Sequence, residues 1–190
     1  MGAAAYTHLI TKVCSTNRGS IWFDSIPQTY KTIMGTVGAA STLASGDGNA
    51  NMDMLINPAG PTYSSYSSPA QGWNKGFMVA GSSTSAIYNH YDTTSGMVGQ
   101  FGSSSYFTYY DDQVNTCVFY CYDYADANTV TSIAFQAGSP FFGTGTTSAS
   151  RPEISIGVGG MVGANAMTSL SVGPNGNFMS GCLISLYGIN

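Results

Sequence analysis

Short runs of apolar and small polar residues recur along the chain, and their spacing is typical of β-strands. Three such runs lie near the C-terminus, over residues 154–158, 168–172 and 183–187. They are rich in β-branched or aromatic residues, and the first two alternate apolar with small polar positions, a pattern that buries one face of a strand. The sequence predicts further strands over residues 20–23, 29–37, 52–56, 76–79, 85–91, 106–109, 114–124 and 129–137.

Helix signals are nearly absent from the same pattern. No window of about a dozen residues keeps apolar positions at the three-and-four spacing of a helix without interruption by Gly, Pro, Ser or Thr. About ten short strands separated by turn-forming residues are typical of a sandwich or barrel. We therefore predict an all-β fold, an antiparallel two-sheet β-sandwich of the jelly-roll-like kind with almost no helix.

Turns and loops divide these strands without separating domains. Residues 173–177 form a dense turn signal, whereas residues 39–51 and 143–150 crowd small residues without periodicity and are expected to be loops. The longest strand, over residues 114–124, is apolar on both sides and is expected at the centre of a sheet. Residues 20–190 are predicted to form one β-sandwich domain. Residues 1–19 form either an arm that contacts a neighbouring subunit or a first strand of the same sandwich.

Charged residues are scarce. Asp, Glu, Lys and Arg make up 7% of the 190 residues, against roughly 25% in an average globular protein. The five cations, Lys12, Arg18, Lys31, Lys75 and Arg151, are spread along the chain. No basic cluster is available to neutralise phosphates, so nucleic acid is not an expected partner. A polar, uncharged, Tyr-rich surface loses little on desolvation against another protein, which suits a subunit of an assembly.

The chain carries no targeting or membrane signal. No run of about 18 apolar residues is present, and residues 1–6 lack the features of a signal peptide. We expect no membrane association and synthesis in the cytoplasm, where thiols stay reduced. Cys117 and Cys121 would lie about 13 Å apart along a strand, beyond the reach of a disulfide. Together with Cys14 and Cys182 they are predicted to be free thiols, and buried small side chains rather than a metal pair.

Residues that could carry catalysis are few. His8 and His90 are the only histidines, and neither a Gly-x-Ser-x-Gly elbow nor a zinc-type His-x-x-x-His motif occurs. The acids Asp111–Asp112, or Asp123 with Asp126, leave open a glycosidase pair, which needs two carboxyls about 5 to 9.5 Å apart beside a sugar-sized cleft. We predict a non-enzymatic protein with no catalytic, cofactor-binding or metal-binding residues.

Three segments resemble a family of small β-sandwich domains in structural proteins of tailed phages. Residues 23–33, Phe-Asp-Ser-Ile-Pro-Gln-Thr-Tyr-Lys-Thr-Ile, match the family's opening Phe-x-x-Ile-Pro-x-Thr-Tyr-x-x-Leu. Residues 122–128, Tyr-Asp-Tyr-Ala-Asp-Ala-Asn, match its middle Asp-Tyr-Ala-x-x-x-Asn. Residues 168–189 lead through Thr-Ser-Leu and Gly-Asn-Phe to Leu-Ile-Ser-Leu-Tyr-Gly-Ile, where the family ends on Phe-x-Leu-Tyr-Gly-Ile. The matches occur in family order, while residues 55–63 depart from the family's Phe-Asn-Gly-Asp-x-Gly-x-Asn-Tyr loop.

The resemblance implies a virion structural protein. Only residues 1–19 are expected outside the sandwich, which leaves no room for the attachment region and shaft of a tail fibre, so we expect a capsid decoration, or cement, protein on the capsid surface. Its expected partners are the major capsid protein, whose shell it would stabilise from outside, and itself, as a homotrimer by family habit. The alternative is a receptor-binding tail-fibre or tail-tip domain that recognises a host surface glycan.

Two groups of residues are candidates for subunit contacts. The first lies in residues 1–19 and mixes apolar with cationic side chains: Tyr6, Leu9, Ile10, Lys12 and Arg18. The second lies in or near a predicted loop and is aromatic: Tyr63, Tyr66, Trp73 and Phe77. Aromatic rings with a polar tip are enriched where subunits meet. The alternatives are a first strand folded onto its own sandwich for the first group, and scattered exposed aromatics without a role for the second.

Overall fold

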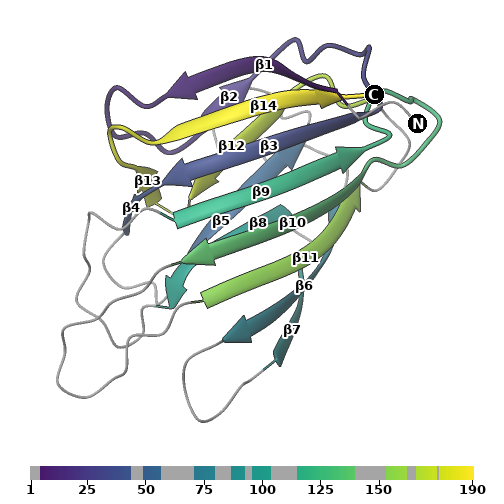
Figure 1. The fold of residues 1–190 in the computed structure, drawn as a ribbon. Coiled ribbons are helices and arrows are strands. Elements are labelled where there is room, and N and C mark those ends of the chain that lie inside the picture. The colour runs from purple at the N-terminus through teal and green to yellow at the C-terminus, as the bar shows by residue number, and fades with distance from the viewer. Residues whose placement is uncertain are drawn as a thin grey trace, which may run out of the picture.

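The computed structural model shows a two-layered all-β protein (Figure 1). It describes residues 5–43, 49–56, 71–79, 87–92, 96–103, 115–139, 153–161, 166–174 and 176–190. This part of the chain contains strands and turns but no helix, and hence none long and apolar enough to cross a membrane. The predicted all-β, antiparallel, sandwich-like fold is confirmed for these residues.

The large sheet has eight strands, and every neighbouring pair is antiparallel. In order across the sheet they are β1 (Tyr6–Val13), β14 (Leu183–Ile189), β3 (Thr32–Ala39), β9 (Asn115–Tyr122), β10 (Ser132–Ser139), β11 (Glu153–Met161), β6 (Gln71–Val79) and β7 (Ile87–Asp92). The first and last strands therefore lie side by side at one edge (Figure 1). β9 lies inside the sheet between β3 and β10, which confirms the central position predicted for residues 114–124.

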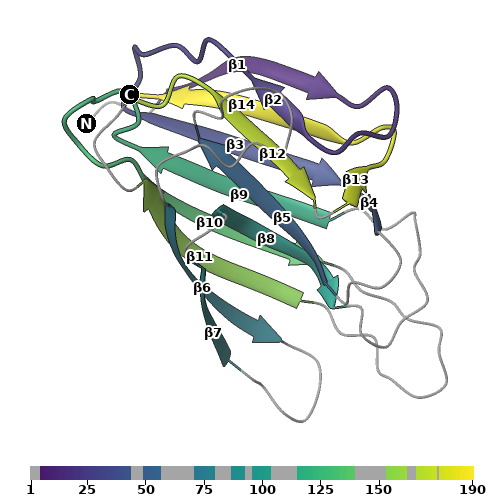
Figure 2. The same cartoon turned by 180° about the vertical axis from the view of Figure 1, so that it is seen from behind.

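A smaller sheet packs on one face of the large one. Its strands, in order, are β2 (Ile21–Phe23), β12 (Leu170–Pro174), β5 (Asn49–Ile56) and β8 (Gly96–Ser103). The small sheet lies behind the large sheet in Figure 1 and in front of it in Figure 2. A two-stranded ribbon of β13 (Gly176–Phe178) and β4 (Ser41–Leu43) lies at one end of the sandwich.

Alternation within the strands fills the space between the two sheets. In β3, Ile33, Val37 and Ala39 are buried, while Met34 and Thr36 point to the other side and are half-buried. The small sheet contributes the buried side chains Ile21, Phe23, Met54, Leu170 and Val172. Burying one such side chain stabilises a fold by roughly 1.5–3 kcal/mol. This burial holds together a chain that has few charges and no helical hydrogen bonds in its described part.

Two aromatic rings in the core lie over glycines of the neighbouring backbone. Gly35 of β3 is paired with Phe119 of β9, and a Cβ at Gly35 would lie 1.9 Å from Phe119 Cζ. Gly188 of β14 is covered in the same way, because a Cβ there would lie 2.4 Å from Tyr30 Cγ. In both places the ring takes the volume that a side chain would fill. Glycine is required there by close approach rather than by backbone conformation.

The three segments that carry the family resemblance meet in space, at what we call the Tyr124 junction. The buried Tyr124 hydroxyl donates to the Pro27 carbonyl, and the Ile26 amide donates to the Thr168 carbonyl (3.0 Å). The Met167 amide, next to Thr168, donates to the Tyr124 carbonyl (2.6 Å). The Gln28 side-chain amide donates to the Ile26 carbonyl (2.8 Å) and to the Met167 carbonyl (3.0 Å). These bonds tie the turns after β2 and after β9 to the segment before β12.

The structure has strands that the sequence pattern did not predict. β8 was not expected, because its glycines at positions 96, 99 and 102 interrupt the apolar alternation. Residues 39–51 were expected to be a loop, yet they contain β4 and the start of β5, whose ladders with β13 and β8 override weak local propensity. The predicted strand 106–109 and loop 143–150 lie outside the described residues.

Residues 6–13 form β1, the edge strand of the large sheet. They pair with β14 from Tyr6–Ile189 to Val13–Leu183, with a register shift between His8 and Ile10. The sequence left open whether residues 1–19 form an arm or a first strand. The structure shows that residues 6–13 form a strand of the sandwich, while contact with a neighbouring subunit stays a prediction. Arg18 lies beyond the strand, and its backbone bridges to Phe178.

We expect Gly35→Ala to lower the free energy of unfolding by about 2–3 kcal/mol, because the new methyl group displaces the buried Phe119 ring. Gly38→Ala on the same strand is the matched control, since its Cβ would meet only Leu183 Cγ at 3.8 Å. It should change stability by less than about 1 kcal/mol. Urea denaturation followed by circular dichroism measures both. Equal effects of the two substitutions would contradict the packing of Phe119 on Gly35.

The Tyr124 junction predicts a second pair of stabilities. Tyr124→Phe removes the hydroxyl that donates to Pro27 and should cost about 1 kcal/mol. Tyr122→Phe, two residues away on an exposed ring, should cost less than about 0.5 kcal/mol. Denaturant midpoints of the two variants give the comparison, and a Tyr124→Phe variant as stable as Tyr122→Phe would contradict a structural role for the junction.

Candidate interaction surface

Side chains on the uncovered side of the large sheet form a continuous surface without charge. Strand pairing aligns them in four rows, of which two cross six strands from β1 to β11 and two cross five strands from β1 to β10. One row is His8, Tyr187, Met34, Tyr120, Ala134 and Val158, and the next is Thr11, Ser185, Thr36, Val118, Gln136 and Ile156. Two outer rows are Tyr6, Ile189, Thr32, Tyr122 and Ser132, and Val13, Leu183, Gly38, Thr116 and Gly138. These four rows are the outer face, and none of their residues is Asp, Glu, Lys or Arg.

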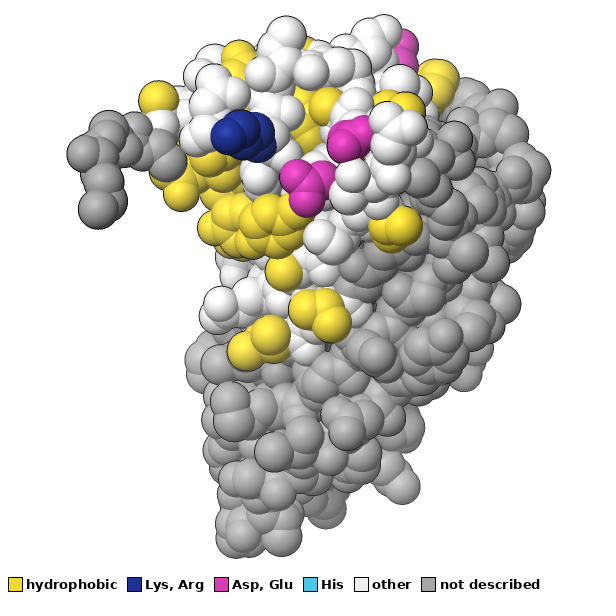
Figure 3. Space-filling model, turned by 90° about the vertical axis from the view of Figure 1, so that its right-hand side faces the viewer, with side chains coloured by type: hydrophobic (Ala, Val, Ile, Leu, Met, Phe, Trp, Pro, Cys, Tyr) yellow, Lys and Arg dark blue, Asp and Glu magenta, His cyan; other side chains and the backbone are white. Residues whose placement is uncertain are grey.

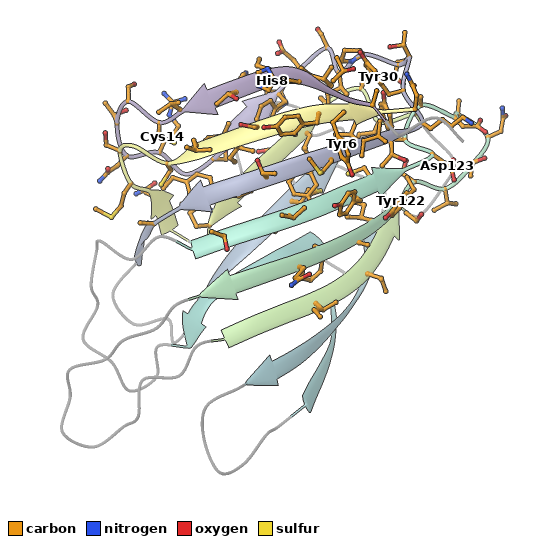
Figure 4. All side chains as sticks on the ribbon, viewed as in Figure 1. Tyr6, His8, Cys14, Tyr30, Tyr122 and Asp123 are labelled. Atoms are coloured by element: carbon orange, nitrogen blue, oxygen red, sulfur yellow. The ribbon has the colours of Figure 1, made fainter. Side chains whose placement is uncertain are left out.

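The polar groups of the outer face at β1 bond to one another. Thr11 Oγ1 lies 2.8 Å from His8 Nε2 and 2.7 Å from Ser185 Oγ, across the β1–β14 pair. The His8 ring meets the Tyr187 ring edge-on, with centroids 5.3 Å apart. These contacts help to fix the pairing of β1 with β14. They also give the side chains of His8, Thr11 and Ser185 hydrogen-bond partners within the chain. Figure 4 labels His8 and Tyr6 on β1 and Tyr122 on β9.

Large apolar side chains stand out from the same face. Val13 and Val158, near opposite edges of the six strands, are 60% and 58% exposed, and Ile156, Leu183 and Tyr122 are also exposed. The rings of Tyr120 and Tyr122 stack with centroids 6.1 Å apart. Interfaces favour such uncharged surfaces with aromatic and aliphatic side chains. The outer face is thus chemically suited to contact another protein.

The outer face is hollowed over β9 and β10. A hollow of about 330 Å³ is lined by Thr116, Val118, Gln136 and Gly138, all of which belong to the outer face, together with Cys117 and Ala137. Gly138 contributes no side chain, and its hypothetical Cβ would meet only Thr116 Oγ1 at 3.7 Å. A protruding side chain of a partner could therefore enter the surface here.

Lys31 and Asp123 lie at one end of the large sheet, where the Asp123 amide donates to the Lys31 carbonyl (3.1 Å). This is the end at which β1 begins and β14 ends (Figure 1). Seen from this end, hydrophobic side chains gather beside a small group of acidic and basic ones (Figure 3). The Lys12 ammonium turns to the other side of β1, where it donates to the Trp22 carbonyl (2.6 Å) and lies 5.2 Å from the Phe23 ring centroid.

The residues of positions 1–19 that were predicted as subunit contacts differ in exposure and in their contacts within the chain. Tyr6 lies on the outer face and is exposed. Ile10 is exposed but is paired with the buried Leu186, and Leu9 packs against the core. The Lys12 side chain is engaged within the chain, and Arg18 has an exposed side chain on a backbone bonded to Phe178.

The aromatic group predicted as contacts is only partly described. Tyr63 and Tyr66 lie outside the described residues. Trp73 and Phe77 belong to β6, where their backbones pair with Gly159 and Ser155 of β11, rather than to a loop.

The exposure of the apolar residues of β11 was not predicted from the sequence. The alternation over 154–158 predicts that the apolar face is buried, but Gly157 is buried while Ile156 and Val158 are exposed. The prediction failed because a period of two reveals two different faces without revealing which one a second sheet covers. β12 was also expected to bury one face, but Leu170, Ser171 and Val172 are all buried.

The acids and histidines considered above lie in different parts of the described chain, with His8 in β1, His90 in β7, and Asp123 and Asp126 in the turn after β9. Asp126 accepts hydrogen bonds from the Asn128 amide and the Thr129 hydroxyl, both at 2.8 Å, and these bonds hold the pKa of its carboxyl below the usual range. A glycosidase acid needs a raised pKa instead. His90 lies in β7, and Asp111 and Asp112 lie outside the described residues. No three His, Cys, Asp or Glu side chains of the described part cluster as metal ligands.

All four cysteines are buried, and none of them forms a disulfide. Cys14 and Cys182 extend the β1–β14 ladder, where the Cys14 amide donates to the Cys182 carbonyl (2.8 Å). Cys117 and Cys121 point from β9 into the core. Burial raises the pKa of each thiol, that of Cys121 to about 12.

Comparisons with family models, with curated proteins and with solved structures found no match to this chain. The resemblance to phage sandwich domains therefore stays a prediction carried by the three segments of the Tyr124 junction.

The buried Cys121 thiol makes stability depend on alkaline pH. In the unfolded chain a thiol ionises near pH 8.5, whereas in the folded chain Cys121 keeps its proton to about pH 12. Above about pH 8.5 the unfolded state binds fewer protons, so the free energy of unfolding should fall by about 1.4 kcal/mol per pH unit for this thiol. Denaturant titrations between about pH 9 and 11 should therefore show a shallower fall for Cys121→Ala than for the parent protein. Parallel curves would contradict a protonated Cys121.

Proposed function

We propose that this chain is a non-enzymatic structural subunit of a tailed-phage particle, a capsid decoration protein. In this proposal it binds as a homotrimer to the outer surface of the shell of major capsid proteins and stabilises that shell. The observation that carries the proposal is the uncharged outer face, which suits contact between the subunits of an assembly. A symmetric ring that touches several shell subunits at once would gain avidity from simultaneous contacts.

The resemblance supports a structural role through the positions of its residues. The residues Ile26, Pro27, Tyr124 and Gly188, which belong to the three matching segments, are engaged in hydrogen bonds or packing within the chain. They would maintain the sandwich rather than perform chemistry. These residues do not belong to the outer face, which therefore remains the candidate surface for contact with other proteins.

A receptor-binding tail-tip domain is the second candidate. The stacked pair Tyr120 and Tyr122 favours it, because the flat faces of sugars pack on aromatic rings. The two candidates differ in how many copies a particle carries. A shell offers a repeated lattice of sites, whereas a tail tip offers few.

We expect on the order of hundreds of copies of this chain per particle of the phage that encodes it, as a repeated shell lattice requires. Quantitative gel analysis of purified particles, calibrated on the major capsid protein, measures this number. Particles that lack the chain should release their DNA at a lower temperature and regain the normal release temperature when purified protein is added back. A few to tens of copies would overturn the decoration role in favour of the tail tip.

A further inference from the structure

The outer face is large enough to be a complete protein interface. It spans six strands, which at about 4.8 Å between strands and about 3.4 Å per residue gives a plane of roughly 600–700 Å². A standard interface buries about 800 Å² on each partner. The area of the outer face is close to this value, so one partner molecule could cover it.

Because the outer face carries no charged side chain, it favours a partner whose contacting surface also has few charges. A partner rich in Asp, Glu, Lys or Arg would have to bury ions against a surface that offers them no counter-ion, which is costly. A matching partner must itself be poor in charge. This chain meets that condition, because only 7% of its residues are charged. A second copy therefore offers few ions that such a contact would have to bury.

The edge of β1 is a less suitable contact than the face beside it. β1 has a register shift after His8 and directs Lys12 to the inner side, two devices that hinder the addition of another strand. A neighbouring copy would therefore be held by side chains on the outer face rather than by an extended sheet. The hollow over β9 and β10 offers a place for one of its side chains.

We infer that the outer face is the contact between copies of this chain, and that a second copy covers it. The inference rests on the proposed function for the number of copies, which is three. In a closed ring of three, each copy presents its outer face to a different surface of the next copy. Val13 and Val158 then become buried at opposite sides of one interface.

The test is a charge placed on the outer face. Val158→Glu and Val13→Glu each put a carboxylate on a side chain that is exposed in the single chain, so folding is retained. Ala127→Glu is the control, because Ala127 is exposed in the turn between β9 and β10 and belongs to none of the four rows of the outer face. Circular dichroism and thermal unfolding establish that all three variants keep the parent fold.

Sedimentation equilibrium of the full-length protein, without particles, measures the assembly. The parent protein and Ala127→Glu should sediment as three chains of 19.8 kDa. Val158→Glu and Val13→Glu should dissociate to single chains, with association weakened at least tenfold. A monomeric parent protein, or folded Val158→Glu and Val13→Glu that remain trimeric, would overturn the inference.

Copy number on particles separates this inference from the function on which it rests. If both outer-face variants stay trimeric but no longer bind particles, the outer face contacts the shell, which overturns the inference and leaves decoration standing. If the variants dissociate while the parent protein is present in only a few copies per particle, decoration fails and the inference stands.

Discussion

The Tyr124 junction is the constraint on which the remaining structure depends. A sandwich without helices in its described part must bring distant segments together before any of its strands is covered, and each closure costs loop entropy. The phenol of Tyr124 and the backbone groups of Ile26, Pro27 and Met167 join three such segments in one place. Burial raises the pKa of the Tyr124 hydroxyl, so it keeps the proton that it donates.

The junction also links the two sheets. The turn that holds Pro27 lies between β2 of the small sheet and β3 of the large one, so fixing it aligns the two layers. Next to it, the Lys31 amide donates to the Ile189 carbonyl and Tyr30 lies over Gly188, which positions β14 between β3 and β1. Contacts made by the residues just before β3 therefore help to hold β14 beside β3 in the large sheet.

The small sheet covers one side of the large sheet, and the composition of the other side is unusual. In this chain the uncovered side carries valine, isoleucine, leucine and tyrosine where antiparallel sheets in contact with water usually carry polar and charged residues. The side chains on it are ordered by cross-strand contacts such as the His8–Thr11–Ser185 network. Little side-chain entropy remains to be lost when a partner covers them, which favours tight contact.

The sequence by itself determined the class of fold, the central strand and the absence of a cationic cluster, because period-two alternation, turn residues and charge are local properties. It also identified the segments of the Tyr124 junction, although not that they meet. Only the tertiary structure decided that β8 and β4 exist, since their pairing partners are remote in sequence. It likewise decided that Ile156 and Val158 face outward and Lys12 inward. Alternation defines two faces of a strand, but the second sheet, which packs from elsewhere in the chain, decides which of them is buried.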